Sequence, residues 1–158
     1  MARRSLIRSC TVACSLLLAP LAGRCQDRAD YGKNADSLAV YRTMLTAIAQ
    51  DSQLTGPDRQ TAQALLAATE LCYESVYALS QMKKLDACLS QESRSTMGNI
   101  CYDYEFRSLN LLSDKKDSID AWLQRTNNPA ILATGGQLSN YLSRITDQIR
   151  RWIKRRKF

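Results

Sequence analysis

Residues 71–104 read LCYESVYALSQMKKLDACLSQESRSTMGNICYDY, and this stretch decides the fold. Two segments with apolar residues at helical spacing flank the small and polar run 90–96. If that run reverses the chain, the flanking segments become two antiparallel helices. The sequence therefore predicts a long helical hairpin with its tip at Arg94 and Ser95.

The position of this tip predicts a disulfide between Cys88 and Cys101, because the two cysteines lie almost symmetrically about it. Cys72 cannot bond Cys88 within one helix, since their separation of sixteen residues spans roughly 24 Å. A disulfide needs Cα atoms within about 7 Å of each other. Cys72 therefore pairs with Cys25, if the mature protein retains Cys25, or stays unpaired.

Residues 1–25 have the pattern of a secretory signal peptide, with a basic start, an apolar stretch and the small residues Ala22 and Gly23. The apolar stretch is shorter than the roughly 20 residues that span a bilayer. Cleavage after Gly23 or after Cys25 fits the pattern, so the mature protein has four or three cysteines. We expect a protein that is exported to the periplasm or secreted, and soluble after cleavage. An oxidising compartment favours disulfides over metal ligands.

The composition is typical of one folded helical domain. Apolar residues make up 45% of the 158 residues, with only six glycines and three prolines. No useful stretch alternates between apolar and polar residues, so we expect an all-α fold. The predicted organisation is a signal peptide (1–25), a helical domain (26–149) and a basic tail (150–158) that continues the last helix.

Helical spacing predicts four helices, packed as a small bundle in which a long coiled-coil-like hairpin carries flanking helices. The first begins near Asn34 or Asp36, the second covers about 57–90, the third opens between 96 and 99, and the fourth runs from Gln137 onward. Gly135 and Gly136 are expected to form a flexible joint before the last helix. The expected seam of the second helix is Ala62, Leu65, Thr69, Cys72, Val76 and Leu79.

The net charge of +7 is concentrated at the C-terminus, where six of the 22 basic residues occupy the last nine positions. A basic helix with an apolar stripe is typical of contacts with anionic membranes. Cations at a helix C-terminus are also favoured simply by the backbone dipole. The residues that would contact a membrane or another anionic partner are Arg150, Arg151, Trp152, Lys154, Arg155, Arg156 and Lys157.

The chain has no histidine, which excludes Ser-His-Asp and Cys-His catalytic sites and histidine-containing zinc sites. It also has no glycine-rich phosphate loop and no calcium loop. Glu70 and Glu74, four residues apart on one helix, remain as a candidate acid and base, although such a pair is more typical of a solvated helix face. We expect no catalytic residue, no metal, no cofactor and no nucleic-acid partner.

Four tyrosines, Tyr73, Tyr77, Tyr102 and Tyr104, lie on the two arms of the hairpin. They predict either an aromatic recognition patch or ordinary packing, because tyrosine offers a large contact area at low entropic cost.

The sequence favours a non-catalytic binding or adaptor protein of the bacterial periplasm or cell envelope. It would have a protein partner and act as an assembly component or an inhibitor. One alternative is action at a membrane surface through the amphipathic basic C-terminal helix. A second alternative is a carboxylate-based cell-wall hydrolase.

Overall fold

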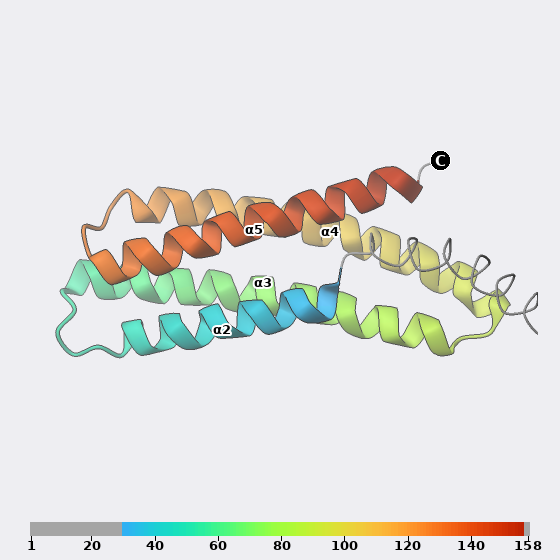
Figure 1. Cartoon of the computed structure of the whole chain (residues 1–158), viewed down its shortest axis with the longest axis horizontal. Coiled ribbons are helices and arrows are strands. Elements are labelled where there is room, and N and C mark those ends of the chain that lie inside the picture. Colours follow the sequence, from blue (N-terminus) through green and yellow to red (C-terminus); the bar gives the residue numbers. More distant parts are fainter. Residues whose placement is uncertain (1–29, 157–158) are drawn as a thin grey trace, which may run out of the picture.

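A computed structural model describes residues 30–156 of the chain. These residues form four helices and no strand: α2 (Tyr31–Ala49), α3 (Gly56–Cys88), α4 (Gln91–Leu123) and α5 (Pro129–Arg156). Successive helices run in opposite directions, and α2 with α3 forms one layer beneath α4 with α5 (Figure 1). The predicted all-helical bundle is confirmed for this part of the chain. None of the four described helices has the length and apolar content needed to cross a bilayer.

All four helices begin with the same kind of N-cap, in which a side-chain oxygen accepts a hydrogen bond from an otherwise unpaired N–H of the first turn. The capping residues are Asp30, Thr55, Ser90 and Asn128. Pro57 and Pro129 lie in the first turns of α3 and α5, where a missing N–H breaks no helical hydrogen bond. The connections are short, and short connections make consecutive helices antiparallel neighbours.

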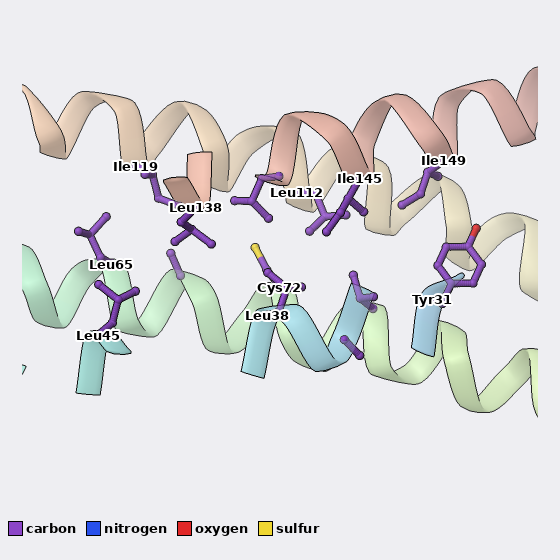
Figure 2. Packing of buried hydrophobic residues seen from close by; sticks show 14 of the residues in the cluster. Tyr31, Leu38, Leu45, Leu65, Cys72, Leu112, Ile119, Leu138, Ile145 and Ile149 are labelled. Atoms are coloured by element: carbon purple, nitrogen blue, oxygen red, sulfur yellow. The ribbon is translucent and has the colours of Figure 1, made fainter. Parts of the chain in front are cut away.

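The core is one cluster of apolar side chains to which all four helices contribute. In Figure 2 the labelled side chains of α2 and α3 lie opposite those of α4 and α5 and fill the space between the layers. The predicted seam of α3 is confirmed, because all six of its residues have no exposed surface.

Hydrogen bonds between side chains also link different helices. Ser75 Oγ in α3 donates to Ser108 Oγ in α4 over 2.8 Å, and both serines are buried. The other pairs between helices are Tyr31 with Glu105, Asn34 with Gln148, Asn34 with Tyr141 and Asp120 with Ser139. Asp58 of α3 is bonded in the same way to Thr126 in the connection between α4 and α5. Polar side chains that leave water are stable only when paired in this way.

The chain reverses earlier than the sequence predicted. α3 ends at Cys88 and α4 begins at Gln91, so the reversal occupies Leu89 and Ser90, about five residues before the predicted tip. The small polar run forms the first turns of α4 because Ser90 caps that helix. Glu92 in the first turn adds a favourable interaction with the helix dipole.

The predicted disulfide between Cys88 and Cys101 is not formed in the structure. Cys88 is exposed at the end of α3, whereas Cys101 is buried. The contact between Ser75 and Ser108 sets the level at which α3 and α4 face each other. By that register Cys88 lies six residues, or roughly 9 Å, beyond the level of Cys101, which exceeds the Cα separation of about 7 Å that a disulfide allows. The earlier reversal is therefore the reason for the difference. Cys25, the predicted partner of Cys72, lies outside the described residues.

Gly135 and Gly136 are not a joint. α5 begins at Pro129, eight residues before the predicted start, and passes through both glycines as one helix. A Cβ atom on Gly135 would lie 2.5 Å from Cδ2 of Leu123. Glycine at this position therefore lets the start of α5 approach the end of α4 closely.

Candidate functional site

A surface groove of about 310 Å³ lies between α3 and α4. The hydrogen-bonded Ser75 and Ser108 form its buried floor. The remaining lining residues combine apolar and charged side chains: Leu71, Glu74, Tyr104, Arg107 and Leu111. Because no residue of α2 or α5 lines the groove, it belongs to the hairpin alone.

Apolar side chains continue from the groove toward the tip of the hairpin. Leu71 is 44% exposed, Leu85 is 55% exposed and Ile100 is 49% exposed. We define the α3–α4 face as Ala64, Leu71, Glu74, Ala78 and Leu85 of α3 with Met97, Ile100, Tyr104, Arg107 and Leu111 of α4. Exposed apolar side chains that follow one another along a surface are typical of contact sites, whereas scattered ones are not.

The two charged residues of the groove come from opposite walls. Glu74 in α3 and Arg107 in α4 are both exposed, and within residues 30–156 neither forms an ion pair. The two carboxylates that the sequence offered as an acid and a base do not share the groove, because Glu74 lines it and Glu70 does not. The arrangement can therefore offer one negative and one positive charge to a molecule that docks here.

The four tyrosines do not gather into one patch. Tyr73 and Tyr77 stack on each other with ring centroids 5.7 Å apart, and the guanidinium of Arg42 in α2 lies 4.6 Å from the Tyr73 ring centre. Tyr104 lines the groove on the other flank of the hairpin. Tyr102 is partly buried against the core. Only Tyr104 is thus brought together with the charged residues of the groove.

Most of the predicted anionic-contact residues lie at the end of α5. Those in the helix are Arg150, Arg151, Trp152, Lys154, Arg155 and Arg156, whereas Lys157 lies outside the described residues. Arg150 is partly neutralised by an ion pair with Asp147, in which Nη1 and Oδ1 are 2.8 Å apart. The chain thus presents a basic helix end, as the sequence indicated.

The apolar stripe of α5 is already occupied. Ile149 and Ile153 are buried in the core. Trp152 is half-buried, and Nζ of Lys83 lies 5.5 Å from its ring centre, within the range of a cation–π contact. A helix that lies in a membrane must expose such a stripe to lipid. The membrane-surface prediction therefore depends on the basic side chains alone.

A buried ionic cluster near the N-terminus of α2 was not predicted from the sequence. The Glu105 side chain has no exposed surface, and its Oε1 lies 3.2 Å from Nζ of Lys83. The hydroxyl of Tyr31 donates to the same oxygen over 3.1 Å. The spacing of the sequence does indicate that Glu105 is buried. Glu105, Leu112 and Ile119 follow one another at seven-residue spacing and share the inner face of α4.

Cys72 lies at the centre of the core and has no exposed surface. Burial raises the pKa of its thiol from 9.0 to about 12, and the nearby charge of Lys115 only partly opposes this shift. A thiol that stays protonated is a poor nucleophile and a poor metal ligand. Cys72 therefore acts as a small apolar side chain.

No family model, curated protein or solved structure matches this chain.

Proposed function

We propose that the chain is an exported, non-catalytic binding protein of the bacterial cell envelope that holds a protein partner on the α3–α4 face. The observation that carries this proposal is that Leu71 is exposed in the groove beside its charged side chains, and that Leu85 and Ile100 are exposed further toward the tip of the hairpin. The basic and apolar pattern of residues 1–25 supports export.

The composition of the face suits protein recognition. Interfaces place apolar and aromatic side chains at their centre and satisfy a small number of charged groups at defined positions. Leu71, Leu111 and Tyr104 supply the apolar surface, while Glu74 and Arg107 can fix the orientation of a partner. An assembly component and an inhibitor would both use such a face.

A photo-crosslinking residue placed at Leu71 tests the proposal in the native cell envelope. Val40 in α2, which is 58% exposed on another part of the surface, provides the matched control position. We expect a defined crosslinked protein from position 71 and none from position 40. Equal crosslinking from both positions, or none from either, would contradict a docking role for this face.

A further inference from the structure

The α3–α4 face carries two sets of side chains at seven-residue spacing. On α3 these are Ala64, Leu71, Ala78 and Leu85, and on α4 they are Met97, Tyr104 and Leu111. A seven-residue repeat keeps side chains along one stripe of a helix and forms the seam of coiled coils. The α3 stripe lies outside the main core, because Leu71 and Leu85 are exposed. The side chains of the α4 stripe are half-buried, and Tyr104 also packs against the edge of the core.

The two stripes correspond level by level. The contact between Ser75 and Ser108 shows which positions of the antiparallel helices face each other. By this register Leu71 lies within one residue of the level of Leu111, and Leu85 within one residue of the level of Met97. The small Ala78 lies within one residue of the level of the large Tyr104, and Glu74 lies within about two residues, or roughly 3 Å, of the level of Arg107.

We propose that the α3–α4 face binds a second copy of this chain through a two-fold axis parallel to the helices. Rotation about such an axis does not change the height of any residue along the helices. It places α3 of one copy against α4 of the other. Apolar side chains of one copy then contact apolar side chains of the other, and the small Ala78 faces the large Tyr104. Glu74 of each copy faces Arg107 of its partner. A two-fold interface requires this self-complementarity, because the same surface serves both subunits.

The charges explain why a second copy fits this face. In the described structure Glu74 and Arg107 form no ion pair within the chain. Two-fold pairing would give each of them an opposite charge on the other copy. Charges placed in this way set the partner and the register of an interface more than its strength.

The size of the face indicates a weak dimer. From Ala64 to Leu85 the face is roughly 32 Å long, and it is two helices wide. Because each helix is about 10 Å wide, the contact is about 600 Å² per copy. Specific interfaces bury about 800 Å² per partner. Association should therefore depend on protein concentration in the micromolar to millimolar range.

Charge reversal gives the test, read by sedimentation velocity of the purified protein over that concentration range in the presence of a reductant. The reductant is needed because the exposed Cys88 could otherwise link copies covalently. Glu74→Arg brings two arginines together in both halves of the dimer, and Arg107→Glu brings two glutamates together. Each variant alone should be monomeric at concentrations where the wild type is dimeric.

An equimolar mixture of the two variants should form a heterodimer, because one half of its interface then joins the arginine introduced in one variant to the glutamate introduced in the other, and the other half joins the native pair. Leu71→Asp should also abolish association, whereas Val40→Asp should leave it unchanged. All four positions are exposed, so circular dichroism should show the same folded state in every variant. A monomeric wild type, variants that dimerise like the wild type, or a mixture that stays monomeric would overturn the proposal.

This inference rests on the proposed function of the face and can fail separately from it. If the purified protein is monomeric but position 71 still captures another envelope protein, self-association is overturned and the binding function stands. If the protein dimerises and position 71 crosslinks only to a second copy, the face binds this chain rather than a different partner.

Discussion

The thiol of Cys72 should be unreactive in the folded protein. Its pKa is raised to about 12 by burial, and only the thiolate attacks a disulfide reagent. We expect the exposed Cys88 to react with an aromatic disulfide at neutral pH within minutes and Cys72 to react only after denaturant is added. Labelling followed by peptide mass spectrometry distinguishes the two residues. Equal rates in the native state would contradict the burial of Cys72.

Because Cys72 is buried, the protein should lose stability as the pH becomes alkaline. The contribution of Cys72 is fully present below its unfolded pKa near 9, because both states then hold the proton. It is lost as the pH rises toward about 12, because the unfolded chain releases the proton first. The loss amounts to roughly 2 kcal/mol by about pH 10.5. The stability difference between the wild type and Cys72→Ala, measured by urea unfolding, should therefore shrink as the pH rises from about 8 to about 10.5, and a constant difference would contradict this.

The ion pair between Lys83 and Glu105 should matter because the carboxylate is buried. Lys83→Met keeps most of the side-chain length but removes the charge, and we expect a loss of roughly 2–4 kcal/mol in unfolding free energy. Tyr31→Phe removes the hydroxyl that donates to the same charged oxygen and should cost about 1.5–3 kcal/mol. Lys84→Met changes an exposed neighbour and should be nearly neutral. Urea unfolding compares the three variants, and equal effects of Lys83→Met and Lys84→Met would refute the role of the pair.

At the scale of helices, the two adjacent glycines of α5 should respond oppositely to alanine. Gly136 has open space where a Cβ would lie, so Gly136→Ala should stabilise the protein by about 1 kcal/mol through helix propensity. Gly135→Ala would place its Cβ 2.5 Å from Leu123 Cδ2, and moving that side chain should cancel the gain. Thermal unfolding of both variants tests the contrast. A similar increase in Tm for both would show that Leu123 moves aside without cost.

The start of α3 is joined to the connection between α4 and α5. The hydroxyls of Thr126 and then Thr55 donate to Asp58 and lower the pKa of its carboxyl. This contribution to stability is present above the ordinary pKa of aspartate and is lost as the pH falls through the lowered value. Thr126→Val should move the pKa of Asp58 up toward its ordinary value in an NMR titration. Thr43→Val, whose hydroxyl bonds only within its own helix, should leave that pKa unchanged.

Helix interiors were predictable from the sequence, and helix ends were less so. The seam of α3 follows from spacing alone, because side chains three and four residues apart share one helix face. The start of α4 was misplaced because the run of small polar residues after Ser90 suits both a loop and the first turns of a capped helix. The start of α5 was misplaced because the reason for Gly135 is a contact with Leu123, which lies in another helix.

For the whole molecule, the hairpin of α3 and α4 extends beyond the start of α2 (Figure 1). The first residues of α4, 91–96, are all exposed. Local opening needs less energy where few buried contacts are lost. We expect amides of residues 95–100 to exchange about tenfold or more faster than those of residues 108–113, which lie within the bundle. Uniform protection along α4 in hydrogen-exchange mass spectrometry would contradict this gradient.

The candidate site could be predicted only in part. Glu74 and Tyr104 attract attention by residue type, but their proximity depends on the register between α3 and α4, which a wrong tip position shifts. Arg107 and Leu111 carry no motif of their own. The basic end of α5 was evident from composition, whereas the burial of Ile149 and Ile153 required the packed bundle to be seen.

The hydrogen bonds that join the helices have a consequence for how the bundle selects its alignment. Leucine and isoleucine side chains would tolerate a helix that slid by one turn, since the apolar stripe nearly repeats. Ser75 and Asn34 would not, because both are buried and each would lose its hydroxyl or amide partner in another helix, at roughly 1–3 kcal/mol each. These hydrogen bonds therefore specify the register of the helices. They destabilise misaligned packings more than they stabilise the correct one.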